Sequence, residues 1–177
     1  MNILIEELSP KQRERLNTFA PYVYPYLGKD VWLAGGSLLD FQRMHEPVDY
    51  DLFAQRPAEL GAEFGYIIRE SALAWTYKNN IQVIKRSYNS IEDLLNSFDF
   101  TIRMIGTDGT FLYKVEGWEE AHNNKKIVFN PGEFSNPLTS LVSVVKYGQK
   151  GYTLDYEEGR KFLSSWGVKN SSIMKEY

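Results

Sequence analysis

The sequence predicts an α+β fold, with a mixed α/β core followed by a pair of helices. Strand-length apolar or alternating runs are interspersed with amphipathic helical patterns up to about residue 130. After Pro131-Gly132 the pattern changes to two consecutive helical stretches. The chain has 177 residues, of which 43% are hydrophobic and 15% aromatic, which is enough to bury a sizeable core. We therefore expect an α/β core over residues 1–130 with an N-terminal helix, and a helical segment over 131–177 that packs on it.

The first helix is predicted from its capping residues. Ser9 can cap the helix, Pro10 suits the first helical position, and Gln12 stands where a capping box places its return hydrogen bond. Pro21 and Gly28 then end the helical stretch.

Two strands and a short helix follow the first helix. A buried strand over 30–34 ends at Gly35-Gly36, and a helix begins directly after this turn. Pro47 ends that helix, and residues 48–54 form the next strand.

The remaining elements are predicted from periodicity and turn residues. Further strands are expected at 72–77, 81–86, 98–105, 110–115 and 126–129. Further helices are expected at 58–68, 91–95, 118–122, 137–150 and 155–166. In the helix over 137–150 we expect a buried aliphatic stripe, made of Leu138, Leu141, Val142 and Val145.

Composition excludes several classes of function. The net charge of −3 argues against an extensive nucleic-acid surface, although a local basic groove remains possible. The absence of cysteine excludes disulfides, thiolate zinc sites and cysteine nucleophiles. No apolar run approaches the ~20 residues that cross a bilayer, and the N-terminus lacks a signal-peptide pattern. We therefore expect a cytoplasmic protein without a membrane partner.

Asp49 and Asp51 are the first candidate for chemistry. On a strand they project from one face, ~7 Å apart, while Tyr50 projects from the other. Two such carboxylates can bracket a pair of Mg²⁺ ions that also bind phosphate oxygens. The alternative is an exposed strand face that carries two acids.

The turn Gly35-Gly36-Ser37 is the second candidate. The glycines allow a ligand to approach the backbone closely, and Ser37 at a helix start can add its hydroxyl and amide groups to an anion site. The alternative is an ordinary strand-to-helix connection in which Ser37 is a cap. The turn lacks the length and the lysine of a P-loop.

Asp99 and Lys146 are the remaining candidates. Asp99 lies between two phenylalanines and shares a predicted strand face with Thr101 and Arg103. A buried acid needs a partner, so Asp99 is either a third metal-binding carboxylate or the partner of Arg103 or Lys85 in a salt bridge. Lys146, in the helix over 137–150, either contacts a triphosphate or is a solvated lysine.

The stretch from Gly35-Gly36-Ser37 to Asp49-Tyr50-Asp51, with a later acid at Asp99, resembles the nucleotidyltransferase superfamily typified by DNA polymerase β. It is especially similar to the head domain of CCA-adding enzymes and poly(A) polymerases, over roughly residues 30–105. The resemblance implies a nucleotidyltransferase-like mixed sheet flanked by helices. It also implies roles: the turn binds a nucleoside triphosphate, Asp49 and Asp51 hold two Mg²⁺ ions, and Asp99 assists the acceptor hydroxyl.

The sequence departs from these enzymes at two points. Leu39 stands where the CCA-adding head usually has an arginine, and the long basic helical domains that grip tRNA are missing. We therefore expect a compact transferase that moves a nucleoside monophosphate from an NTP to an acceptor hydroxyl of a protein, an RNA end or a small molecule. The alternative is a catalytically inactive module of the same fold, such as an antitoxin or inhibitor. A third reading is an unrelated α/β protein in which the motif is coincidental.

Overall fold

The structure is a computed structural model, and it describes residues 1–130 and 136–170. The chain divides into two compact units. Unit 1 comprises Met1–Asn96 and Arg103–Glu116, and unit 2 comprises Ser97–Ile102 and Gly117–Tyr177. The predicted boundary near residue 130 stays a prediction, because compactness alone does not test which segments fold independently.

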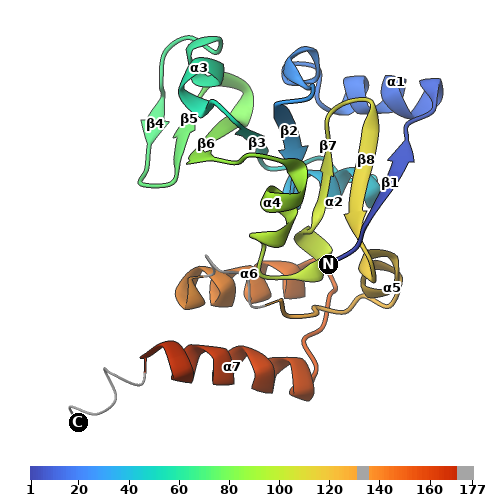
Figure 1. Cartoon of the computed structure of the whole chain (residues 1–177), viewed down its shortest axis with the longest axis vertical. Helices are drawn as coiled ribbons and strands as arrows, with labels where there is room; N and C mark the ends of the chain where they lie inside the picture. The colour runs from blue at the N-terminus through green and yellow to red at the C-terminus, as the bar shows by residue number, and fades with distance from the viewer. Residues whose placement is uncertain (131–135, 171–177) are drawn as a thin grey trace. The chain divides into compact units, whose positions relative to one another are not determined.

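Unit 1 is built on a mixed sheet. Within the described residues its strands are β1 (Ile3–Glu7), β2 (Val31–Ala34), β3 (Tyr50–Ala54), β4 (Arg69–Glu70), β5 (Ala74–Thr76), β6 (Ile81–Ser87), β7 (Ile105–Thr107) and β8 (Phe111–Val115). Their order is β1-β8-β7-β2-β3-β6-β5-β4, so β1 and β4 form the two edges (Figure 1). Only β3 and β6 pair in parallel; the other neighbours in this sheet are antiparallel. The predicted α+β class with a mixed sheet is confirmed.

The helices of the described chain are short, apart from α1 and the last two. They are α1 (Pro10–Phe19), α2 (Gly36–Gln42), α3 (Pro57–Ala62), α4 (Ile91–Asn96), α5 (Trp118–Asn123), α6 (Pro137–Gln149) and α7 (Tyr156–Asn170). Three 3₁₀ turns add η1 (Tyr24–Tyr26), η2 (Lys78–Asn80) and η3 (Thr101–Arg103). Over the described residues, none of these helices has the length and hydrophobicity needed to cross a bilayer.

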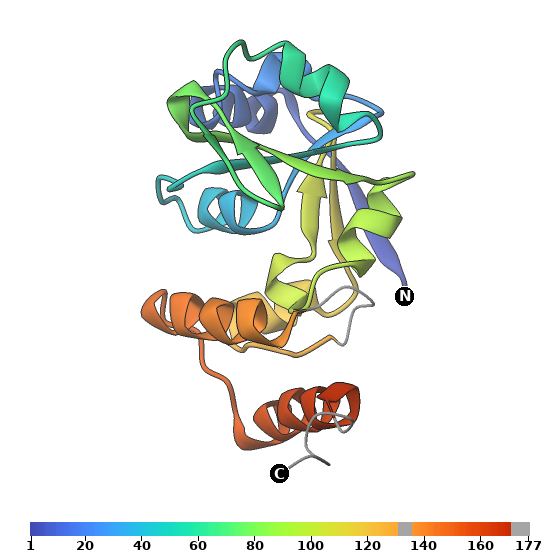
Figure 2. The same cartoon turned by 90° about the vertical axis from the view of Figure 1, so that its left-hand side faces the viewer.

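Helices cover both faces of the sheet in unit 1. On one face α1 packs against α2, with the rings of Phe19 and Phe41 5.1 Å apart. On the other face α4 packs closely on β7 (Figure 2), since a Cβ at Gly106 would lie 2.7 Å from Ile91 and 3.5 Å from the Cβ of Ala34. Position 106 is thus a point of close approach that only glycine fits without a shift of its neighbours.

The local predictions at helix starts are confirmed. The amide of Gln12 donates to Ser9 Oγ over 3.2 Å, and the amide of Ser9 donates to Gln12 Oε1 over 2.7 Å, which completes the capping box of α1. At α4, the amide of Asp93 donates to Ser90 Oγ over 3.2 Å, so Ser90 caps this helix.

Two elements of unit 1 differ from the prediction. The N-terminal strand β1 pairs with β8 from Ile3↔Val115 to Glu7↔Phe111, and its short apolar run did not indicate a strand. The helix expected at 58–68 stops at Ala62, because Gly65 adopts a left-handed conformation with φ 84° and ends the helical path.

The predicted strand over 98–105 is wrong. Its backbone bonds elsewhere: the amide of Thr101 donates to the carbonyl of Val128, and the amide of Asn130 to the carbonyl of Asp99. Residues 101–103 form η3, and extended pairing starts only at Ile105. The alternating pattern was misleading because consecutive residues, such as Asp99 and Phe100, are both buried. In a strand with one buried face they would point to opposite faces, so burial does not follow a period of two here.

The predicted strand over 126–129 is also wrong. The segment makes isolated bridges, Lys126↔Thr153 and Phe100↔Phe129, in place of a continuous ladder. The apolar residues Ile127 and Phe129 are buried, which explains why the run had the composition of a strand.

The two predicted C-terminal helices are present as α6 and α7, but the predicted burial of α6 is wrong. Leu138, Leu141, Val142 and Val145 are 70%, 46%, 62% and 59% exposed. The helix buries Ser140 and Tyr147 instead, which lie on its opposite face. The polar contact of Ser140 with Asp99 sets this orientation, and the apolar stripe faces outward within unit 2.

Candidate functional site

The glycine turn and the paired acids lie at neighbouring strand ends of the sheet in unit 1. Strand β2 runs into Gly35, and its antiparallel neighbour β3 begins at Tyr50. The register of the pair places Leu33 opposite Leu52, and its continuation by one residue brings Ala34 beside Asp51. The turn therefore follows the strand end that adjoins the start of β3.

The turn requires glycine at its first position. Gly35 has φ 74° and ψ −134°, a combination essentially restricted to glycine. Its amide donates to the carbonyl of Ile105 and its carbonyl accepts from the amide of Leu39, each over 3.0 Å, so the turn is tied both to β7 and to α2. Ser37 is only 2% exposed, and its hydroxyl lies 3.5 Å from the carbonyl oxygen of Ala34.

Replacing Gly35 with alanine should destabilise the protein by about 1–3 kcal/mol, because a Cβ is disfavoured at this backbone conformation. Urea unfolding followed by circular dichroism measures the change. Gly148→Ala is the matched control: this helical glycine has no neighbouring atom within 4 Å of an added Cβ, so that change should be neutral or slightly stabilising. A Gly35→Ala protein as stable as the parent would contradict the role of the turn.

Gln82 links the two acids. Asp49 immediately precedes β3 and Asp51 lies within it. Gln82 on β6 is the parallel partner of Asp51, so the two side chains share a face of the sheet. Gln82 Nε2 donates to Asp49 Oδ2 over 3.1 Å, and this bond holds the side chain of Asp49 toward the face that carries Asp51.

Asp99 and Lys146 belong to unit 2, whereas the turn and the paired acids belong to unit 1. Asp99 is 5% exposed, and its Oδ2 accepts a 2.6 Å hydrogen bond from the hydroxyl of Ser140 on α6. Lys85, one of the two cations considered for Asp99, pairs with Glu70. Lys146 is exposed in the last turn of α6.

Asp49 and Asp51 are the groups at this site that could hold a divalent metal. Among the described residues, no group of three or more histidines, aspartates and glutamates is arranged to hold a metal ion. Asp49 and Asp51 nonetheless supply two carboxylates on one face, a set that fits Mg²⁺, which needs few protein ligands when substrate phosphates and water complete its shell.

The sequence did not reveal the contacts of two residues near the site. Gln82 was not recognised, because its role depends on the parallel pairing of β3 with β6 across 30 residues of chain. Arg43 was not recognised either: its side chain is only 15% exposed, and it pairs with the buried Asp40 over 3.1 Å. Their spacing of three residues on a helix was the available signal.

Comparison with known proteins places these features in a family and a fold. A model described as Gad2, Gabija anti-defense 2 family protein, matches residues 10–123, which is well over half of the chain. No curated protein sequence matches.

Solved CCA-adding enzymes share the fold over nearly the whole chain. A complex with ATP has a TM-score of 0.71 at 16% identity and covers 99% of this chain and 48% of that one. A complex with CTP has a TM-score of 0.67 at 18% identity, covering 96% and 46%. The Thermotoga maritima enzyme with tRNA has a TM-score of 0.61 at 17% identity, covering 93% and 46%. The fold is therefore that of nucleotidyltransferases, and the chain spans about half the length of these enzymes.

Proposed function

The chain belongs to the Gabija anti-defense 2 family, and from this premise and its nucleotidyltransferase fold we propose that it transfers a nucleoside monophosphate from an NTP to an acceptor hydroxyl, with release of pyrophosphate. The observation that carries the proposal is that the Gly35 turn lies beside Asp49 and Asp51, where β2 ends and β3 begins. A glycine turn that admits a phosphate chain and a pair of carboxylates that hold its counterion are the two parts this reaction needs.

Each part of the site has a role in this proposal. Gly35, Gly36 and Ser37 bind the triphosphate. Asp49 and Asp51 hold two Mg²⁺ ions, which when bound neutralise the phosphates and lower the pKa of the attacking hydroxyl. Gln82 orients Asp49 through Oδ2 and leaves Oδ1 for a cation.

The roles of Asp99 and Lys146, both in unit 2, stay proposals. Asp99 is proposed as the acid that assists the acceptor hydroxyl, and Lys146 as a triphosphate contact. The hydroxyl of Ser140 keeps the carboxylate of Asp99 hydrogen-bonded in its buried position.

The acceptor is proposed by class. The related structures were solved with ATP, CTP and tRNA, which supports an NTP as the donor. The net charge of −3 argues against tRNA as the acceptor. The family description supports a component of the Gabija defence system as the acceptor.

The second candidate is a non-catalytic inhibitor of the same fold. The anti-defense description of the family favours it. Such a module would bind its target without turning over a nucleotide.

Nucleotide binding and turnover separate the two candidates. A transferase should be stabilised by NTP only when Mg²⁺ is present, by about 3 °C or more at saturating ligand, and should move label from an α-³²P NTP to a component of Gabija-containing extract. The same protein with EDTA is the control. No Mg²⁺-dependent stabilisation and no labelled product would reject the transferase in favour of the inhibitor.

A further inference from the structure

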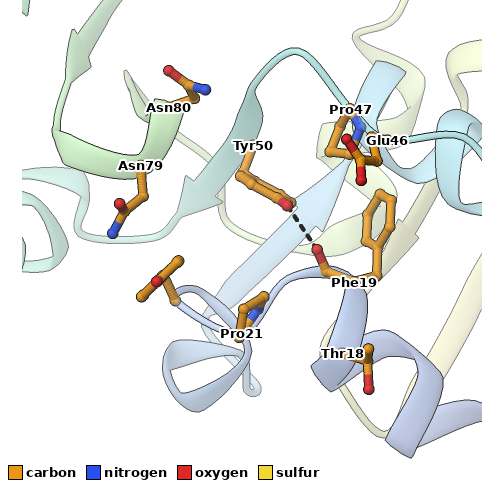
Figure 3. Close-up of a pocket in the computed structure, with 9 residues that line it drawn as sticks. Thr18, Phe19, Pro21, Glu46, Pro47, Tyr50, Asn79 and Asn80 are labelled. Atoms are coloured by element: carbon orange, nitrogen blue, oxygen red, sulfur yellow. Dashed lines mark hydrogen bonds between the residues drawn. The ribbon is translucent and has the colours of Figure 1, made fainter.

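A hollow of about 470 Å³ lies in unit 1, on the face of β3 opposite the paired acids. Tyr50 forms its centre, and because side chains alternate along a strand, Tyr50 and Asp51 project from opposite faces. Figure 3 shows Tyr50 with Asn79 and Asn80 on one side and Glu46 and Pro47 on the other. The hydroxyl of Tyr50 donates to the carbonyl of Phe19 over 2.6 Å, which fixes the ring against the end of α1. The size of the hollow suits a small molecule or one large side chain.

Glu46 is the only charged residue that lines this hollow. Within the described chain it forms no ion pair, although Lys11, Arg15 and His45 line a neighbouring hollow that Glu46 also borders. The pKa of the Tyr50 hydroxyl is raised above its ordinary value, first by burial and then by the negative charge of Glu46. A single unpaired carboxylate repels anionic ligands and favours a cation.

Asn79 and Asn80 add further hydrogen-bonding groups. Both have left-handed backbones, with φ 62° and 58°, a conformation that is uncommon outside glycine and that costs free energy even for asparagine. Neither side-chain amide makes a hydrogen bond to another described residue, so both carbonyl oxygens can accept from a ligand. Both side chains are exposed where they line the hollow, so a ligand can reach these acceptors.

The ring of Tyr22 completes the lining. It is 58% exposed, so one face is open to a planar group. A guanidinium stacks on such a ring and carries five donors for the acceptors around it.

We propose that this hollow binds an arginine side chain of a partner polypeptide, with its guanidinium paired to Glu46 and stacked on Tyr22. Lysine would leave the planar face of Tyr22 unused, and a nucleotide would place its phosphate beside Glu46. The proposal concerns binding alone and holds whether or not the protein catalyses transfer.

Two capped five-residue peptides test the proposal, one with a central arginine and one with citrulline, which has nearly the same shape without the charge. Titrations of the intact protein, followed by NMR chemical shifts, should show the arginine peptide shifting the signals of Tyr22, Asn79 and Asn80. The citrulline peptide should bind at least about fivefold more weakly, since it lacks the charge-assisted contact.

Glu46→Gln should remove this discrimination, and Glu14→Gln, an exposed acid of α1 outside the hollow, should retain it. Equal binding of the two peptides, no binding by either up to about 20 mM (a Kd above the millimolar range), or an unaltered preference in Glu46→Gln would overturn the proposal. Uridine or adenosine binding at the same residues, in preference to the arginine peptide, would assign the hollow to a nucleoside and also overturn it.

Discussion

Asp51→Asn is expected to lower the rate of nucleotidyl transfer by at least about a thousandfold while the fold is retained. The asparagine keeps the shape and half of the hydrogen-bonding capacity of Asp51 but removes the charge that holds the cation opposite the triphosphate. Asp51 lies within β3 and its backbone bonds are unaffected, so circular dichroism and the unfolding midpoint should match the parent. Release of labelled pyrophosphate per unit time measures the rate.

Asp93→Asn provides the matched control. Asp93 is an exposed acid in the first turn of α4, and its loss leaves the carboxylates of the site in place. That variant should retain the parental rate. A transfer rate in Asp51→Asn within tenfold of Asp93→Asn would mean that the paired acids are not the metal ligands.

Trp118→Ala is expected to destabilise the protein by about 3–5 kcal/mol, the largest effect on stability that the structure indicates. The side chain is 1% exposed, its ring stacks on His122 with centroids 4.8 Å apart, and its Nε1 donates to the carbonyl of Ile102 over 3.1 Å. Removal would leave a large cavity and an unsatisfied buried carbonyl beside η3. Urea unfolding monitored by circular dichroism gives the free-energy change.

Trp118→Phe separates packing from the hydrogen bond. Phenylalanine fills most of the space but lacks the indole N–H, so this variant should lose less stability than alanine. A loss below about 1 kcal/mol for Trp118→Ala would show that the site collapses around the missing ring and that Trp118 does not anchor unit 2.

The features that depend on neighbours within a few residues were predictable. The capping box of α1 joins Ser9 and Gln12, three positions apart, and any sequence with these residues can form it. The same holds for the glycine turn, whose φ of 74° follows from the need for a sharp reversal between strand and helix.

Features set by distant pairing were not predictable. Gln82 reaches Asp49 only because β3 and β6 pair in parallel, and the sequence around Gln82 does not indicate that pairing. The segment over 98–105 had the alternation of a strand, but its backbone groups bond to Val128 and Asn130, far along the chain. Tertiary contacts overrode the pattern there.

The outward apolar stripe of α6 has a related cause. Periodicity identifies an apolar face of a helix, but it does not say that this face is the one that packs. In α6 the contact of Ser140 with Asp99 determines the orientation, because a buried carboxylate must keep its hydrogen-bond partner.

Gly106 limits which substitutions the region behind the turn can accept without a shift of neighbouring side chains. A methyl group there would meet the tip of Ile91 and the side chain of Ala34, which directly precedes the glycine turn. A larger residue at this position requires the tip of Ile91 to shift, so we expect the effect of a substitution at 106 to depend on the residue at 91.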